Sequence, residues 1–405
     1  MKVLLTFLAV LLTAVRLADG ATPEAFQTRM EVRLRMAAVE RLSVGGGKQV
    51  ESMLREGLEL LADKQKPDGS FGESYHPLNT GLAVLAIVGA GKPTTPKEKT
   101  MLSSAVAWLK KYGEIYNGHL AMVDFELGKE LLAKEPDRQL TLYSGSSGGV
   151  INIVSGHPEL SPDAQRWWRQ CYDPISHAIV CAALTEYSAV EGDDAVKPLV
   201  EKATKIILDA QQVNGGWNEH FERAGPANLW TSAFQVRALK SVMAAGFNVE
   251  PVKKAIASAG KYGAGDYVPK GGPKWLIFKD KQSEIWDGLY LATANPASRS
   301  SLPQTAVKSS VDGWKGGDLN LYGEHLVGIG RLDQFMPAIW QQREGIFKDC
   351  YSSLVRNLVK NRYPKTFVDV HIGQGLTSKM IYGHPVAQLS ILLRALETPY
   401  LFNQQ

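Results

Sequence analysis

Polar and aromatic side chains recur near the beginnings of successive apolar helical segments in this sequence. Histidine and aspartate transfer protons, and large aromatic rings bind apolar ligands. We predict four catalytic candidates with acid–base groups: Asp173, His177, Asp287 and His325. We predict six further residues that bind a ligand: His76, Trp230, Trp286, Tyr322, Tyr382 and His384.

One pair has the spacing of an acid–base unit. Asp173 and His177 are four residues apart and share one helix face, so the carboxylate can orient the imidazole. The alternative is structural, because Asp173 precedes Pro174 as a natural N-cap and a paired histidine is commonly a satisfied core residue. Asp287 follows Trp286 at another helix start and has the same structural alternative.

The later pairs differ in geometry. Tyr322 and His325, three residues apart, can face one site together. Tyr382 and His384 do not share one helical face, although a helix can begin there. These positions converge only if the helices that carry them begin at the same end of the molecule.

Helices of two kinds alternate along the chain. Segments with a one-sided apolar stripe belong on the surface, whereas segments apolar on most faces are surrounded by protein. The amphipathic segments are 51–61, 99–112, 197–212, 251–262 and 337–361. The apolar segments are 79–91, 116–133, 173–190, 229–245, 284–294, 320–332 and 381–397. Since apolar inner helices favour a closed array, we predict an all-α fold, an α/α toroid of six or seven outer–inner pairs without a significant strand.

Two stretches interrupt this rhythm. Residues 143–156 are rich in glycine and serine, and residues 263–281 include Gly265, Gly271, Gly272 and Pro273. We interpret the first as a loop over one mouth of the ring or a badly formed helix. The second is interpreted as an insertion of the same kind.

A short motif stands at the hinge between an outer and an inner segment. It occurs twice, each time as glutamine, glycine and an aromatic residue: Gln211, Gly215 and Trp217, and earlier Gln65, Gly69 and Phe71. The glutamine can bond free backbone groups at helix ends, the glycine permits a tight turn, and the ring stacks under the next hairpin. These residues are therefore expected to be structural.

This motif resembles the QxxxGxW repeat of the squalene-cyclase and protein-prenyltransferase superfamily. The resemblance covers residues 50–399 and is closest to exported bacterial members. It implies an α/α toroid whose inner helices surround a central cavity, with a site near the starts of those helices. There, Trp230 and Trp286 either line the cavity or close the ring.

The known chemistry of the superfamily does not transfer to this sequence. Neither the DxDD segment that protonates an alkene nor the DDxxD segment that binds metal diphosphate is present, and the thioester motif is absent. Asp349 and Cys350, with His384, superficially resemble the zinc ligands of prenyltransferases. However, the first two lie on an expected outer helix, and zinc ligands must converge to about 2.0–2.3 Å from the metal. We predict no cofactor and no metal.

The N-terminus predicts export. Lys2 precedes an apolar run over 3–15, and small residues at Ala18 and Gly20 form a signal-peptidase site, with an uncleaved anchor as the alternative. We divide the chain into a signal peptide (1–20), a charged helical lead-in (21–48), the toroid (49–399) and a tail (400–405). After cleavage we expect a periplasmic or extracellular protein that is not integral to a membrane.

The charge and composition of the chain limit the kinds of partner that it can bind. A formal charge of +4 over 405 residues, without a basic patch, does not favour nucleic acid, and 44% hydrophobic residues suffice for a large core. Three cysteines, Cys171, Cys181 and Cys350, allow at most one disulfide.

Three functions stay open at this point. The first is a toroid with a central cavity for a small apolar molecule and no assigned reaction. The second is a carbohydrate-active lyase or hydrolase acting on a glycan, which needs carboxylate or His groups facing each other across a cleft. The third is a non-catalytic scaffold that binds a protein.

Overall fold

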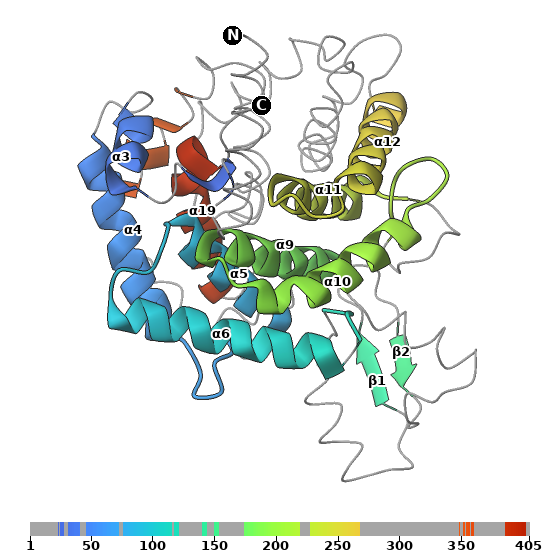
Figure 1. Cartoon of the computed structure of the whole chain (residues 1–405), viewed down its shortest axis with the longest axis horizontal. Helices are drawn as coiled ribbons and strands as arrows, with labels where there is room; N and C mark the ends of the chain where they lie inside the picture. The colour runs from blue at the N-terminus through green and yellow to red at the C-terminus, as the bar shows by residue number, and fades with distance from the viewer. Residues whose placement is uncertain are drawn as a thin grey trace, which may run out of the picture.

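The described part of the chain is built almost entirely from helices (Figure 1). The computed structural model describes residues 23, 25–27, 31–40, 46–72, 76–115, 117–120, 140–143, 150–153, 174–218, 227–267, 348, 351–352, 354–356, 358–359 and 385–401. The helices are α3 (Val32–Glu40), α4 (Gly47–Ala62), α5 (His76–Gly89), α6 (Pro96–Ile115), α9 (Pro174–Glu191), α10 (Lys197–Ala210), α11 (Leu229–Ala244), α12 (Val249–Tyr267) and α19 (Pro385–Leu401). A 3-10 turn, η1 (Asp194–Val196), precedes α10. The all-α class is thus confirmed.

The helices form two layers. In α5 every residue after His76 is buried, and α9 and α11 are buried on nearly all faces. By contrast, α10 buries one stripe that runs from Leu199 through Ala203 and Ile207 to Ala210, which is the spacing of one helix face. The predicted alternation of amphipathic and apolar segments is therefore confirmed for the described pairs α4–α5 and α10–α11.

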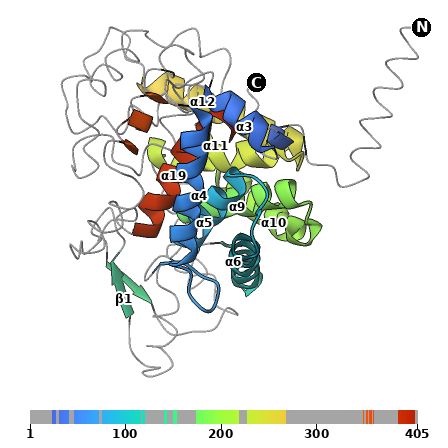
Figure 2. The same ribbon diagram turned by 90° about the vertical axis from the view of Figure 1, so that its left-hand side faces the viewer.

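Both layers follow the same order of neighbours. In the inner layer α19 packs on α5, α5 on α9, and α9 on α11. In the outer layer α4 packs on α6, α6 on α10, and α10 on α12. Figures 1 and 2 both place the C-terminal helix α19 (red) beside the N-terminal helices α4 and α5 (blue).

The helices α19 and α5 run parallel. The carbonyl of Leu85 accepts from Arg394 at 3.2 Å, and Gly89, one turn later in α5, lies against Glu397, which is three residues later in α19. Residue numbers thus rise in the same direction along both helices. Their starts lie at one end of the layer and their C-terminal halves at the other.

The pair α9 and α11 has the same orientation. Pro174 at the start of α9 accepts from Gln235, and Glu186 near the end of α9 accepts from Ser241. Gly81 of α5 lies against Val180 of α9, and Arg394 joins Leu85 to Glu186, so residue numbers rise in the same direction along α5 and α9. The four inner helices therefore begin at a common end, as a shared site at their starts requires.

The two hinge motifs make the same contacts. Gln65 donates through Nε2 to Gly69 O at 3.0 Å and to Met101 O at 2.9 Å. Gln211 donates to Gly215 O at 2.9 Å and to Ala255 O at 2.9 Å. Each glutamine thus closes its own turn and holds the next outer helix. We expected the glutamine to bond free backbone groups at helix ends. Its second acceptor lies instead in the second turn of the next outer helix, α6 or α12.

The glycine and the aromatic ring of each hinge also match. Gly69 and Gly215 have φ of 93° and 94°, and a Cβ on either would meet a carbonyl of the next outer helix, Ser104 O or Ser258 O. Phe71 is fully buried. Trp217 is also fully buried and donates from Nε1 to Ile207 O at 2.7 Å. The two hinges are structural copies of each other, which is consistent with the structural role predicted for them.

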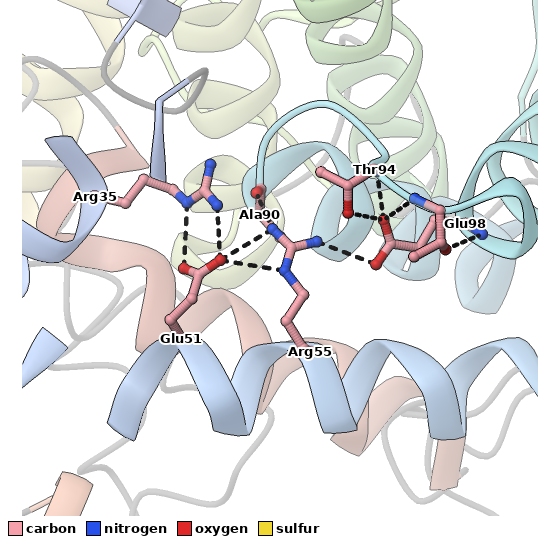
Figure 3. A network of polar contacts seen from close by, with 7 residues as sticks. Arg35, Glu51, Arg55, Ala90, Thr94 and Glu98 are labelled. Carbon is pink, nitrogen blue, oxygen red and sulfur yellow. Dashed lines mark hydrogen bonds and ion pairs between the residues drawn. The ribbon is translucent and has the colours of Figure 1, made fainter. Parts of the chain in front are cut away.

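Charged side chains attach the lead-in helix α3 to the helical layers (Figure 3). Arg35, only 2% exposed, donates to Glu51 at 2.8 Å, and Glu51 in turn pairs with Arg55 at 3.1 Å. Arg55 also pairs with Glu98 at 3.1 Å. Burial opposes ionisation of Glu98, but the N–H of Thr94 and the charge of Arg55 outweigh it, so the pKa of Glu98 is lowered. This chain of contacts runs from α3 through α4 to the start of α6.

Two of the expectations for local structure were wrong. An antiparallel pair, β1 (Leu140–Tyr143) and β2 (Val150–Ile153), joins Leu140 to Ile153 and Tyr143 to Val150 where a loop or a poor helix was expected. Its β-branched residues favour an extended chain and outweigh the glycine and serine signal. In addition, α12 continues to Tyr267, past the expected start of the second insertion at 263.

Candidate functional site

His177 lies in the first turns of α9 with both ring nitrogens in contact with backbone. Leu120 N donates to Nδ1 at 3.0 Å, and Nε2 donates to Ala203 O at 3.1 Å. The ring is 0% exposed, and burial together with the nearby His119 lowers the pKa of His177 to about 3. In this geometry the neutral ring ties α9 to α10 and to residue 120, which matches the structural alternative to the catalytic prediction.

His76 and Trp230 occupy helix starts, as predicted. His76 is the first residue of α5, half-buried, with Nδ1 3.4 Å from Ser70 Oγ and its ring 6.3 Å from that of Trp108. Trp230 is the second residue of α11, half-buried, and meets Phe234 edge-on at 6.5 Å. Since α5 and α11 belong to the parallel inner set, the two side chains lie at the same end of that layer.

The other predicted site residues lie outside the described residues. They are Asp173, Asp287, His325, Trp286, Tyr322, Tyr382 and His384. Asp349 and Cys350, considered as zinc ligands, also lie outside, as do the signal peptide and the apolar segments 121–133, 284–294 and 320–332. These predictions stay predictions. Residues 117–120, where the expected segment 116–133 begins, are described and form a turn instead of a helix start, with positive φ at Asn117 and Gly118.

The described residues contain a buried charged cluster that the sequence analysis missed. Arg394 of α19 binds Glu186 of α9 through two nitrogens, at 3.2 and 3.3 Å, and both side chains are at most 1% exposed. Ser241 of α11 donates to the same carboxylate at 2.8 Å. Because a guanidinium presents parallel donors to a carboxylate, this pair is geometrically specific as well as strong.

A second carboxylate completes the cluster. Glu397 lies 3.7 Å from Arg394 and is fully buried against Gly89, where a Cβ would overlap its Oε2. The hydroxyl of Tyr351 donates to Leu396 O at 2.7 Å. Burial and then the charge of Glu397 raise the pKa of Tyr351 well above its ordinary value. The cluster thus places two carboxylates and one guanidinium between α5, α9, α11 and α19, with the phenol of Tyr351 bound to the α19 backbone beside them.

The contacts of this cluster have a structural role, because they hold the inner helices together. Removing one partner from a buried ion pair leaves the other charge unpaired, and this is strongly destabilising. All its charged groups are buried, and Arg394 links α19 to both α5 and α9. Its sequence signal was available, since a charged residue inside a segment that is otherwise apolar must find a buried partner.

One of the three cysteines, Cys181, lies among the described residues. Cys181 is a buried free thiol beside Thr204, and burial raises the pKa of Cys181 to about 12. Cys171 and Cys350 lie outside the described residues. The part of the chain that the structure describes contains no group of three His, Cys, Asp or Glu side chains placed to hold a metal ion. It also contains no helix both long and apolar enough to cross a bilayer.

Comparisons with known proteins give no identification. No protein-family model matches the chain, and no curated protein matches it significantly. Membership in the squalene-cyclase-like superfamily therefore remains a prediction based on the hinge residues.

Proposed function

We propose that this chain is an exported α/α toroid protein, similar to the squalene-cyclase and prenyltransferase superfamily, with a central cavity that holds a small, largely apolar molecule. Four parallel, buried inner helices whose order brings α19 against α5 carry the proposal, because this contact joins the two ends of the chain. The matching hinges at Gln65 and Gln211 support a repeated unit. We assign no reaction.

Ring closure has a measurable consequence. A compact chain of this length has a radius of gyration of about 21 Å, whereas an open helical array of the same length is larger. Small-angle scattering of the purified protein should therefore give a value near the compact one. A profile that fits only an elongated arc contradicts the toroid.

The proposed ligand and the proposed export can be tested on one preparation. The chain is expressed with its N-terminus intact in a secreting host and recovered from the exported fraction. Intact-mass measurement should give a chain that begins at Ala21, because a signal peptidase reads the small residues at 18 and 20. Native mass spectrometry should show an added mass that disappears after organic extraction, and the extract should contain an apolar molecule.

Two results count against the proposal. A protein that keeps residues 1–20 contradicts cleavage, whatever its ligand. A correctly cleaved protein that carries no extractable molecule and takes up no apolar probe contradicts the cavity. The carbohydrate alternative needs carboxylates across a cleft, and its candidates Asp173, Asp287 and His325 lie outside the described residues, so it stays open.

A further inference from the structure

Two buried hydrogen-bonding groups lie on the face of α11 that meets the start of α9. Gln235 and Thr231 are both 0% exposed and stand one helical turn apart, so they share that face. Gln235 donates from Nε2 to Pro174 O at 2.7 Å, which places its amide at the first residue of α9. Both residues therefore belong to the end where the parallel inner helices begin.

The direction of the Gln235 amide is set by its partner. A backbone carbonyl only accepts hydrogen bonds, so the nitrogen end of the amide must face Pro174. The oxygen end, Oε1, is then fixed as an acceptor. Among the described residues, neither Oε1 of Gln235 nor Oγ1 of Thr231 has a hydrogen-bond partner. Buried polar groups are nearly always satisfied, so two such atoms on one face call for a donor that is not among the described residues.

The surroundings restrict what that donor can be. Gln235 and Thr231 are neutral, and a charged group brought to them would be buried without an opposite charge. The adjacent turns carry apolar side chains, Ile175 of α9 and Phe234 of α11, and Trp230 lies half-buried at the helix start. A hydroxyl group on an apolar body satisfies both the acceptors and the apolar surroundings. A sugar would bring more hydroxyl groups than these two side chains can bind.

We propose that the junction between the starts of α9 and α11 binds the hydroxyl group of a neutral lipid alcohol, with Gln235 Oε1 as acceptor and Thr231 Oγ1 as second partner. This inference rests on the proposed ligand cavity and specifies the head group of its occupant. It also assigns a binding role to two residues outside the predicted site.

The test compares two probes that differ in one donor. 1-Decanol carries an O–H group, whereas decyl methyl ether has a similar chain and an acceptor oxygen but no donor. Isothermal titration calorimetry of the full mature chain should show decanol binding at least about tenfold more tightly, the factor that corresponds to roughly 1.4 kcal/mol. The preference measures the hydrogen bond to the acceptor pair and not the apolar contact.

Variants then locate the preference. Thr231→Val keeps the side-chain shape and removes the hydroxyl, and Gln235→Met keeps the length and removes the amide. Each should reduce the decanol preference severalfold. Because Gln235→Met also loses the bond to Pro174, thermal unfolding by circular dichroism checks that each variant is folded. The matched control is Thr185→Val, an equally buried threonine near the other end of α9 whose hydroxyl donates to Cys181 O at 2.7 Å; it should keep the wild-type preference.

Each outcome has a distinct meaning. Equal affinity of the wild-type protein for the alcohol and the ether overturns the inference, because the two acceptors then add nothing to binding, and leaves the cavity intact. A full preference retained in Thr231→Val and Gln235→Met overturns the assignment to these residues. Failure of both probes to bind argues against the cavity itself.

Discussion

His177 illustrates how residue type and residue role separate. Its position at a helix start and its spacing from Asp173 favoured acid–base chemistry, but the structure uses both ring nitrogens for backbone contacts. A base needs a lone pair that can reach a substrate, and Nδ1 of this ring already accepts from Leu120 N. The folded chain holds the ring in its neutral form. The free energy of unfolding should therefore depend on pH through His177.

The first prediction concerns that dependence. The pKa of His177 is about 3 in the folded chain against 6.5 ordinarily, so between these values the unfolded chain binds a proton that the folded chain does not. The stability linked to the neutral ring is thus fully present above pH 6.5 and lost as pH falls toward 3. His177→Gln removes this titration. Urea unfolding at pH 7, 5.5 and 4 should show a shallower loss of unfolding free energy in the variant than in the wild-type protein.

A control separates this effect from general acid denaturation. His76→Gln changes a half-buried histidine at the start of α5 and should preserve the wild-type pH slope more closely than His177→Gln does. Equal slopes in the wild-type protein and His177→Gln would show that the buried ring does not control the acid response.

At the scale of elements, the hinges convert a local motif into a repeated unit. Gln65 and Gln211 each bind their own turn and the following outer helix, so two helices are fixed by one side chain. The separation between donor and second acceptor is 36 residues in one hinge and 44 in the other, yet the geometry is the same. The two copies thus share the same contacts, although the chain between donor and acceptor differs in length.

The second prediction follows from this equivalence. Gln65→Ala and Gln211→Ala each remove two hydrogen bonds to backbone carbonyls and should lower the free energy of unfolding by similar amounts, about 1–3 kcal/mol each. Gln49→Ala on the exposed face of α4 is the control and should change it by less than about 0.5 kcal/mol. Chemical denaturation of the three variants provides the measurement. A large difference between the two hinge variants would show that the copies are not energetically equivalent.

Periodicity predicted the elements well where one force dominates. Apolar patterning located α9, α11 and α19 to within a few residues, because burial decides their structure. It failed at β1 and β2, where β-branched residues and glycine give opposing local preferences. It also missed Glu186 and Arg394, because a helical pattern identifies a buried face but not which distant helix supplies the partner charge. The starts of the inner helices were predicted, whereas the buried acceptors at Thr231 and Gln235 depend on atomic packing.

At the scale of the whole molecule, the charged cluster joins segments from both ends of the chain. Arg394 contacts Leu85 and Glu186, so α19 is attached at once to the first inner helix and to the middle of the sequence. Gly89 leaves the space that Glu397 occupies, and any side chain there would displace the carboxylate. The polar contacts therefore fix the register of α19 within an otherwise apolar layer.

The third prediction tests this attachment. Arg394→Met leaves Glu186 buried without its cation and should lower the free energy of unfolding by about 3–5 kcal/mol. The double variant Arg394→Met with Glu186→Gln removes the unpaired charge and should recover part of that loss. The exposed pair Lys205–Asp209 is the matched control, since Lys205→Met should cost less than about 1 kcal/mol. Denaturant unfolding of these variants, with a double-mutant cycle, measures the coupling.

The contact between Leu85 and Arg394 also sets the order in which the chain can fold. The two residues are 309 positions apart, so α5 lacks part of its apolar cover until the last helix has been synthesised. A growing chain can complete its early hairpins, but it cannot complete the inner layer. Final assembly is therefore delayed until α19 has been synthesised. C-terminal truncations that remove α19 should expose apolar side chains of α5.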